Sequence, residues 1–388
     1  MVKILSKSTV LRFVLLIGIV NLFADLTYEG ARSITGPFLG MLGASAAAVG
    51  TVAGFGEFVG YTLRSVTGYL ADKTHRYWVA AFLGYAINML AVPALALAGS
   101  WPMAAALMIA ERTGRAIRRP SVETMLSYTG RKMGIGWVFG LNEAMDQGGA
   151  TVGPLVVALV LYLKGGYREA FGVLLLSALL CLGTLTVARF LFPRPQELDT
   201  RMAAPLQTKG YSRAYWLYVA AGALIAAGFA DFSLIAFHFQ KAGSVSAIGI
   251  PLLYSVAMAT GALAALVFGR LFDRLGISMV LLAFFLAAFF APLVFLGGFS
   301  LALLGMVLWG IGIGAQDSLL KAVLTGVTPV EKRSTAFGVF DTGFGIAWFL
   351  GSAAMGFLYD VSLPALIAFS VVSQLAALPV FLLARKRS

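Results

Sequence analysis

Long apolar stretches separated by short polar intervals dominate the chain. Each stretch is roughly 20 residues long, which is the length that an α-helix needs to cross the hydrocarbon core of a bilayer. The twelve stretches lie at 12–38, 45–70, 78–98, 101–118, 136–163, 168–192, 214–240, 246–270, 277–297, 299–321, 334–358 and 363–384. None of them shows the strict alternation that marks the strands of a membrane barrel. The pattern therefore predicts an all-α integral membrane protein with twelve transmembrane helices.

Composition narrows the function classes. The 388 residues are 60% hydrophobic and only 12% charged, whereas a soluble domain carries roughly 25% charged residues. The single cysteine, Cys181, excludes an intramolecular disulfide, and two histidines argue against a metal site built from several histidines. Neither a phosphate-binding G-x-x-x-x-G-K-[ST] loop nor a nucleophile beside a base stands out. We expect neither an enzyme nor an ATP-driven pump, and we expect no cofactor.

The positions of the basic residues predict the topology. Most of the 29 Lys and Arg residues fall on one side of the membrane if both termini are cytoplasmic. The segment "ERTGRAIRRP" (111–120) contributes four arginines, Arg112, Arg115, Arg118 and Arg119, which we assign to this cytoplasmic excess. Arg112 could instead face a central cavity near Glu111 or Glu143. The net charge of +12 is thus interpreted as a topology signal of a prokaryotic inner-membrane protein and not as a nucleic-acid-binding surface.

The two halves of the chain resemble each other. Four short segments recur in the same order, roughly half the chain apart: "FADLT" (23–27) with "FADFS" (229–233), "AVG" (48–50) with "AIG" (247–249), "GYLADK" (68–73) with "GRLFDR" (269–274), and "FGLNEA" (139–144) with "FGVFDT" (337–342). Such a repeat is typical of transporters that rock about a central site. We expect a six-helix bundle over 1–192, a cytoplasmic linker over 193–213 and a second bundle over 214–388.

The repeated loop also carries a family signature. "GYLADKTHR" (68–76) resembles the loop between spans 2 and 3 of the major facilitator superfamily, with His75 where that family has glycine. The resemblance implies two pseudo-symmetric six-helix bundles and a set of conformational-gate residues that brace the cytoplasmic face. In the first copy these are Gly68, Asp72, Lys73 and Arg76, and in the second Gly269, Asp273 and Arg274, followed by Gly276.

A second signature lies in the fifth span. "GGATVGP" (148–154) resembles the antiporter motif of the same superfamily through Gly149, Gly153 and Pro154. The two glycines that follow in the family are replaced here by Val157 and Ala158. The resemblance implies a proton-coupled exporter and adds these three residues to the conformational gate. The spacing of small residues equally suits ordinary packing between helices.

Charged residues inside the spans are the candidate functional groups. In "FADLTYEGAR" (23–32), Asp25, Glu29 and Arg32 are spaced at i, i+4 and i+7, so they share one face of a helix. Charges at membrane depth are costly and usually functional. Two carboxyl groups one turn apart could share a proton while Arg32 competes for the ionised form. We predict proton coupling at Asp25, Glu29, Glu143 and Asp146; a static Glu29–Arg32 pair is the structural alternative.

The resemblance also implies where a substrate binds. Spans 1, 4, 7 and 10 line the cavity in the family, which makes Arg32, Asp231, His238 and Asp317 candidate substrate-binding residues. An alternative use of Asp25, Glu29, Asp231 and His238 is the binding of a divalent metal cation, whose preferred ligands include carboxylate oxygen and imidazole nitrogen.

The expected function is alternating-access transport of a small solute, through proton-coupled export of a small organic molecule by a monomer in a lipid bilayer. One alternative is a symporter or uniporter for a metabolite or organic anion, with Arg32 as the partner of the anion. Another alternative is a divalent-metal exporter. A sensor or scaffold that transports nothing would have no need of the duplicated loop.

Overall fold

The computed structural model describes residues 7–129, 135–195, 211–327 and 333–385, and within these ranges the chain is helical and contains no β-strand. The first half contains α1 (Lys7–Met41), α2 (Ala46–Thr74), α3 (Tyr77–Ala94), α4 (Trp101–Ser127), α6 (Ile135–Tyr162) and α7 (Tyr167–Leu191), with the short 3-10 turn η1 (Leu95–Leu97) after α3. The second half contains α8 (Arg213–Gly228), α9 (Phe232–Ala242), α10 (Gly249–Leu275), α11 (Ile277–Ala287), α12 (Phe290–Leu296), α13 (Phe299–Ala315), the π-helical turn η3 (Gln316–Leu320), α14 (Lys321–Val327), α15 (Arg333–Val361) and α16 (Leu363–Arg385).

Each of the twelve apolar stretches corresponds to one helix or to a row of consecutive helical segments, which confirms the all-α membrane fold. Among the described residues, ten helical stretches are long and apolar enough to cross a membrane. The other two long helices, α2 and α4, have 29 and 27 residues but carry more polar and charged side chains. Since charge at membrane depth is usually functional, α4 in particular becomes a candidate for the site.

The chain divides into two compact units. Unit 1 comprises residues 1–31, 63–98 and 106–204, and unit 2 comprises 32–62, 99–105 and 205–388. The boundaries therefore pass through the interior of α1 and α2, and the first residues of α4 belong to unit 2. The division into 1–192, 193–213 and 214–388 describes the sequence repeat and stays a prediction.

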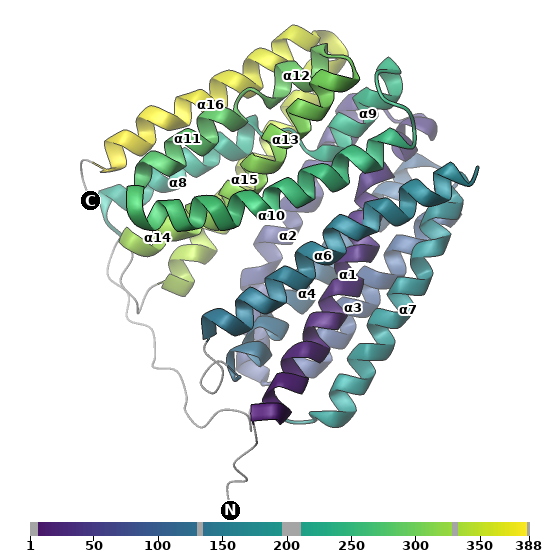
Figure 1. Cartoon of the computed structure of the whole chain (residues 1–388), viewed down its shortest axis with the longest axis vertical. Helices are drawn as coiled ribbons and strands as arrows, with labels where there is room; N and C mark the ends of the chain where they lie inside the picture. Colours follow the sequence, from purple (N-terminus) through teal and green to yellow (C-terminus); the bar gives the residue numbers. More distant parts are fainter. Residues whose placement is uncertain (1–6, 130–134, 196–210, 328–332, 386–388) are drawn as a thin grey trace, which may run out of the picture. The chain divides into compact units, whose positions relative to one another are not determined.

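In unit 1, α3 runs alongside α7 (Figure 1), a pairing that their contacts confirm.

Glycines let α6 of unit 1 approach α1 closely. A Cβ atom on Gly149 of α6 would lie 2.2 Å from the carbonyl oxygen of Leu22, and one on Gly153 would lie 2.3 Å from that of Leu26. The glycines of the antiporter-like motif are thus where α6 packs against the backbone of α1, as small residues spaced one turn apart do in membrane helices.

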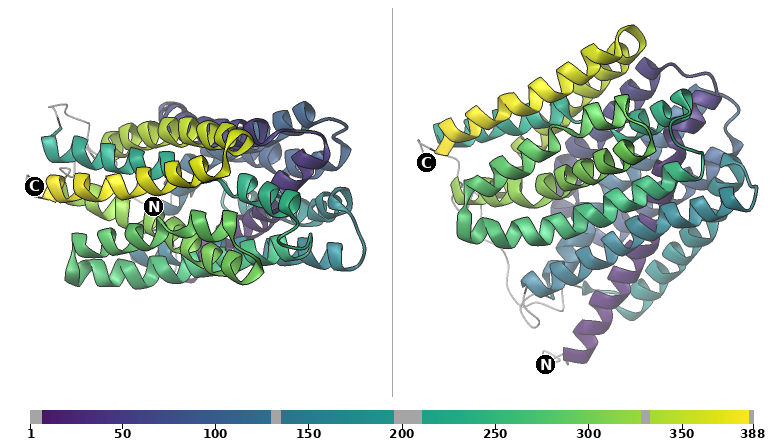
Figure 2. Two further views of the ribbon diagram at one scale, coloured as in Figure 1. Left: turned by 90° about the horizontal axis from the view of Figure 1, so that it is seen from above. Right: turned by 45° about the horizontal axis from the view of Figure 1, so that its top comes forward.

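Unit 2 uses the same device between other helices. α10 packs along α13, and α8 packs against both α15 and α16 (Figures 1 and 2). A Cβ atom on Gly310 of α13 would lie 2.3 Å from the carbonyl oxygen of Ala257, and one on Gly314 would lie 2.2 Å from that of Gly261. Both small-residue contacts hold α13 on α10.

The apolar stretch 214–240, expected as one helix, is interrupted at residues 229–231. Carbonyl groups freed by such a break need partners, because no water is available to them at membrane depth. Trp309 Nε1 donates to the Ala230 carbonyl at 2.9 Å, and Ser370 Oγ donates to the Gly228 carbonyl at 2.6 Å. The break is therefore a satisfied element of unit 2, and it places Asp231 at the start of α9.

Candidate functional site

Two carboxylates of α1 face two arginines of α4 inside unit 1. Arg118 Nη2 lies 3.8 Å from Asp25 Oδ1, and Arg115 Nη1 lies 3.8 Å from Glu29 Oε1. All four residues are buried. Glu29, the later carboxylate along α1, pairs with Arg115, the earlier arginine along α4. This order is expected for two antiparallel helices whose charged residues are spaced by about one turn. The result is a two-rung ladder of buried ion pairs, which we call the α1–α4 charge ladder.

Aromatic rings hold the two guanidinium groups in place. Arg115 lies over the ring of Tyr28 at 4.8 Å from its centroid, and Arg118 lies over the ring of Tyr85 at 4.5 Å. A guanidinium stacked on an aromatic face gains a cation–π interaction that strengthens when water is excluded. The orientation of each arginine is therefore set by packing as well as by its carboxylate.

A chain of hydrogen bonds connects the ladder to α6. Arg118 Nη1 and the Tyr85 hydroxyl both donate to Asn21 Oδ1, the former at 3.2 Å. Asn21 Nδ2 donates to Asn142 Oδ1 at 2.8 Å, and Asn142 Nδ2 donates to Asp146 Oδ2 at 3.2 Å. The other oxygen of Asp146, Oδ1, is buried and accepts no hydrogen bond from the described residues. A carboxylate with one open, buried oxygen therefore ends the chain.

Three arginines of α4 lie in surroundings that the sequence interpretation did not expect. Arg112, Arg115 and Arg118 are buried and do not belong to a solvated cytoplasmic cluster. Arg112 Nε lies 3.4 Å from Glu111 Oε2, one of the two carboxylates that the alternative interpretation named for it. A usable signal was present: Glu111, Arg115 and Arg118 are spaced at i, i+4 and i+7, the same spacing that singled out the charges of α1.

Glu143 and Arg119 have more solvent contact. Glu143 is exposed and accepts a hydrogen bond from Gln147 Nε2 at 3.0 Å. Arg119 Nε donates to Glu123 Oε1 at 2.9 Å in a pair whose side chains are 39% and 52% exposed. Of the four residues predicted for proton coupling, Asp25 and Glu29 are buried in the ladder, the half-buried Asp146 is connected to it by hydrogen bonds, and Glu143 is exposed.

A second charge cluster lies in unit 2, around Arg32. Its Nη2 donates to Glu57 Oε1 of α2 at 3.0 Å and to Asp231 Oδ2 at 2.8 Å. Asp231 also caps α9, since its Oδ1 accepts from the backbone N–H of Ser233 at 2.9 Å. One guanidinium thus connects α1, α2 and the start of α9. Asp231 is therefore a helix cap paired with an arginine, whereas its sequence counterpart Asp25 lies in the middle of a helix.

The other two predicted substrate ligands, His238 and Asp317, have different surroundings. His238 is buried in α9, where its Nδ1 is 3.0 Å from the Tyr359 hydroxyl and its ring packs on Phe295. Asp317 is exposed in η3. Within the described ranges, no three His, Cys, Asp or Glu side chains come together in a way that would hold a metal ion. The guanidinium groups beside Asp25, Glu29 and Asp231 would also compete with a metal cation for these carboxylates.

The two copies of the loop motif share a positive φ at equivalent positions, His75 and Gly276. His75 has a φ of +53°, the left-handed region that glycine adopts most easily, and this explains why glycine is usual at its position. Gly276 of the second copy has φ +58° and ψ −138°. A Cβ on Gly68 would lie 3.4 Å from Pro120 Cβ, while one on Gly269 would meet open space. Lys73, Arg76 and Arg274 are exposed, and the side chains of Asp72 and Asp273 lie outside those that the structure describes.

The ten long apolar helical stretches found among the described residues make this a multi-pass membrane protein, and ionisable groups buried within such helices commonly mark substrate or ion pathways. The sequence profile of the Major Facilitator Superfamily matches residues 18–351 and 219–388. The chain belongs to this superfamily. It is 38% identical over 373 residues to an uncharacterized protein of Mycobacterium tuberculosis, covering 95% of this chain and 91% of the relative. It is 25% identical over 361 residues to an uncharacterized MFS-type transporter of Methanocaldococcus jannaschii, covering 90% and 89% of the two chains.

Solved structures share the fold at low sequence identity. A point mutant of the nucleoside transporter NupG superimposes with a TM-score of 0.78 at 14% identity, covering 95% of this chain and all of that chain. A peptide transporter POT in complex with sulfate gives 0.77 at 16% identity, covering 97% and 94%. A bacterial homologue of the lysosomal transporter Spinster gives 0.67 at 15% identity, covering 98% and 96%. These likenesses confirm the transporter fold.

Proposed function

We propose that this member of the superfamily is a proton-coupled exporter of a small organic molecule and that the α1–α4 charge ladder carries the coupling. In this proposal the protein works as a monomer in a prokaryotic inner membrane, with both termini in the cytoplasm. Asp25, Glu29 and Asp146 exchange protons. Arg32, Asp231 and His238 face the substrate, and the duplicated loop residues and the glycines of α6 form the conformational gate.

The charge balance of the buried network is the observation that supports this proposal. Among the described residues, the ladder and the hydrogen-bond chain that ends at Asp146 contain three carboxylates, Asp25, Glu29 and Asp146, and two guanidinium groups, Arg115 and Arg118. When all of them are ionised, the carboxylates exceed the guanidinium groups by one negative charge. An uncompensated negative charge among packed helices raises the free energy of the protein, so the network favours the uptake of one proton. A proton-coupled carrier needs such a titratable excess.

The geometry also supports a role for the proton in changing partners. The two rungs of the ladder are 3.8 Å long, which is ion-pair contact but longer than a hydrogen bond. A proton on Asp25 would remove the charge that holds Arg118 and leave that guanidinium bonded to Asn21. A proton shifts the equilibrium between two conformations of the carrier only if it binds one of them more tightly than the other. In this proposal, the change of partner by Arg118 is what makes the proton affinities of the two conformations differ.

The same arginines favour a second candidate, a symporter for an organic anion. When Asp25 or Glu29 is protonated, Arg118 or Arg115 becomes available to a carboxylate or phosphate group of a substrate, for which a guanidinium is a suitable fork of donors. This alternative moves the anion partner from Arg32 to α4. Export of a divalent metal receives no comparable support from the paired carboxylates.

The test begins with ligand identification. The purified protein is screened by thermal shift against metabolites, drugs and ions, and each stabilising compound is loaded into proteoliposomes with a pH-sensitive dye in the lumen. For an exporter exchanging substrate for protons, an imposed pH gradient accelerates substrate movement, and substrate movement changes lumenal pH. Asp25→Asn and Asp146→Asn should abolish the pH change while substrate binding persists.

Glu123→Gln is the matched control, because Glu123 is also a carboxylate paired with an arginine of α4 but is exposed to solvent. It should leave coupling intact. Coupling that survives in Asp25→Asn, Glu29→Gln and Asp146→Asn alike contradicts the proposal. Substrate movement with the proton in the same direction, for an anionic substrate, selects the symporter instead.

A further inference from the structure

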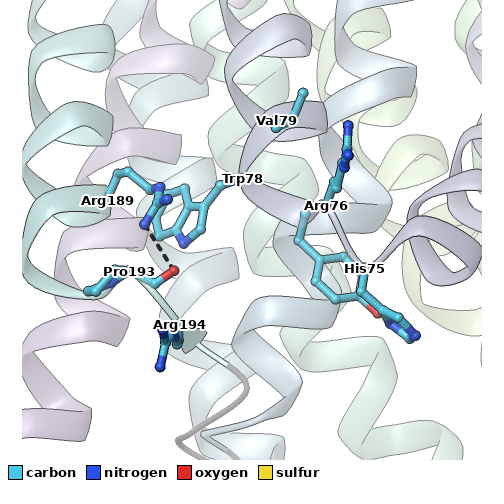
Figure 3. A pocket seen from close by; sticks show the side chains of 8 residues that line it. His75, Arg76, Trp78, Val79, Arg189, Pro193 and Arg194 are labelled. Atoms are coloured by element: carbon cyan, nitrogen blue, oxygen red, sulfur yellow. Dashed lines mark hydrogen bonds between the residues drawn. The ribbon is translucent and has the colours of Figure 1, made fainter.

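A cavity of about 340 Å³ opens at one end of unit 1, beside the start of α3 and the end of α7. Figure 3 shows Arg189 next to Trp78 and Pro193 on one side, with Arg194 below them, and Arg76 and His75 on the other side. Trp78 Nε1 donates to the Phe192 carbonyl at 3.1 Å, and the ring of Phe192 packs on Phe13 near the beginning of α1. The cavity therefore lies at the end of the unit where α1 begins, away from the charge ladder.

The lining of this cavity is strongly basic. Of the eight described residues that line it, three are arginines, Arg76, Arg189 and Arg194, and none is acidic. Within the described part of the chain, neither Arg76 nor Arg189 forms an ion pair with a carboxylate. The Arg189 guanidinium instead donates through Nη1 to the Pro193 carbonyl at 2.9 Å and lies 5.9 Å from the Trp78 ring centroid. Its remaining N–H donors are held in a fixed orientation beside the cavity.

The backbone adds to the positive potential. Tyr77, Trp78 and Val79, the first turn of α3, all line the cavity. The first N–H groups of a helix have no partner within the helix and form the positive end of its dipole. No side chain caps this end, no acidic residue occurs in the first turn, and the N-cap residue is itself Arg76. A cation at this position opposes the helix dipole, so the arrangement is stable with an anion bound between them.

Exposed apolar side chains flank the same site. Val79 and Leu83 of α3 are 61% and 53% exposed, and Phe190 and Leu191 of α7 are 80% and 62% exposed. Both helices are membrane spans, Tyr77–Leu97 and Tyr167–Leu191, so these side chains are at the level where a span meets the headgroup region. The site thus combines a basic cavity with an apolar surface that acyl chains can cover.

We propose that this cavity binds a phosphate group, presented by the headgroup of an anionic phospholipid. Basic cavities between membrane helices suit such headgroups, and the planar guanidinium suits the phosphate oxygens. The lipid source is favoured over a soluble phosphate by the exposed apolar residues beside the cavity. This site shares no residue with the charge ladder, although Arg76 also belongs to the proposed conformational gate.

The test uses the full-length protein in neutral detergent. Its thermal stability is titrated with short-chain phosphatidylglycerol, with phosphatidylcholine of the same chains, and with glycerol phosphate and inorganic phosphate. We expect stabilisation by phosphatidylglycerol at concentrations where the other three have little effect. Since each basic residue near a membrane surface contributes about 1 kcal/mol, Arg76→Gln should weaken the apparent affinity about 5-fold and Arg76→Gln with Arg189→Gln about 25-fold.

Arg270→Gln is the matched control, since it removes one exposed arginine near the end of α10, outside this cavity. It should leave the titration unchanged. Arg76 is exposed and makes no described side-chain contact, so the single variant keeps the test decisive even if the double variant folds poorly. Equal stabilisation by inorganic phosphate overturns the lipid assignment. An unchanged phosphatidylglycerol affinity in Arg76→Gln, or a loss of equal size in Arg270→Gln, overturns the site.

Discussion

Arg32 of α1 donates a 2.8 Å hydrogen bond to Asp231, 199 residues further along the chain, and this contact lies within one compact unit. The same nitrogen reaches Glu57 at 3.0 Å, so one cation serves two buried carboxylates. These three groups carry a net negative charge when all of them are ionised. Removing the arginine would therefore be more harmful than removing either carboxylate.

Arg32→Gln should destabilise the protein by about 3–5 kcal/mol, the usual cost of leaving a buried charge without its partner. The measurement is the loss of thermal stability in detergent. Glu57→Gln in the Arg32→Gln background should recover part of the loss, because it removes one of the two carboxylates that the guanidinium serves. Thr35→Ala is the control, since Thr35 makes a neutral 3.3 Å contact with Ser233 between the same two segments. Equal stability of Arg32→Gln and the wild type would contradict the structure.

Arg118→Lys should impair transport although it keeps the positive charge. Lysine lacks the planar fork that serves Asn21 and Asp25 together, and it lacks the guanidinium face that stacks on Tyr85. We expect the rate in proteoliposomes to fall roughly tenfold, which corresponds to about 1.4 kcal/mol in the barrier. Arg119→Lys is the control because its solvated pair with Glu123 tolerates the exchange. Equal rates in both variants would show that charge alone is needed at position 118.

Gly149→Ala should disrupt the contact between α1 and α6. The added Cβ would lie 2.2 Å from the Leu22 carbonyl oxygen, so the helices must separate, at a cost of about 1–3 kcal/mol or more. The neighbouring Gly148 faces open space, and Gly148→Ala should be neutral or slightly stabilising. Thermal unfolding of the two variants distinguishes a packing role of the motif from a general need for glycine. Equal effects at both positions would contradict the packing role.

Gly276→Ala should destabilise the second copy of the loop motif. Its φ of +58° with ψ of −138° is a conformation that residues with a side chain avoid, and such strain costs about 1–3 kcal/mol. Gly269 of the same motif is inside α10 with no atom near its missing Cβ. Gly269→Ala should therefore stabilise the helix by about 0.5–1 kcal/mol. A lower melting temperature for Gly269→Ala than for Gly276→Ala would be the opposite of this expectation.

The positions of the helical spans could be predicted from hydropathy alone, because the bilayer sets the length of each apolar stretch. The break at residues 229–231 could not, since the side chains that satisfy it, Trp309 and Ser370, come from distant helices. Asp231 and Gly228 could mark a break, but the same sequence FAD at residues 23–25 lies inside the unbroken helix α1. The interruption becomes visible only when the partners of the free carbonyls are known.

The candidate site shows a similar division. The charges of α1 stood out because they lie in an otherwise apolar stretch, whereas Arg115 and Arg118 lie in a basic segment that a topology rule already explains. Their burial depends on the carboxylates of another helix. A rule that counts basic residues near the ends of spans treats such arginines as cytoplasmic, and only their spacing along the helix indicates a shared inward face.

The boundary between Ala31 and Arg32 has a practical consequence for dividing the gene. Although the sequence repeat suggests a cut in the linker, a fragment beginning at residue 205 would lack segment 32–62 of its own compact unit. Asp231 would then lack its partner, the Arg32 guanidinium. The fragment would also lack the N-terminus of α2, where the backbone N–H of Ala47 donates to the Asp360 carboxylate at 2.9 Å. The two halves of this gene should therefore yield stable protein when produced together, whereas the second half produced alone should be degraded.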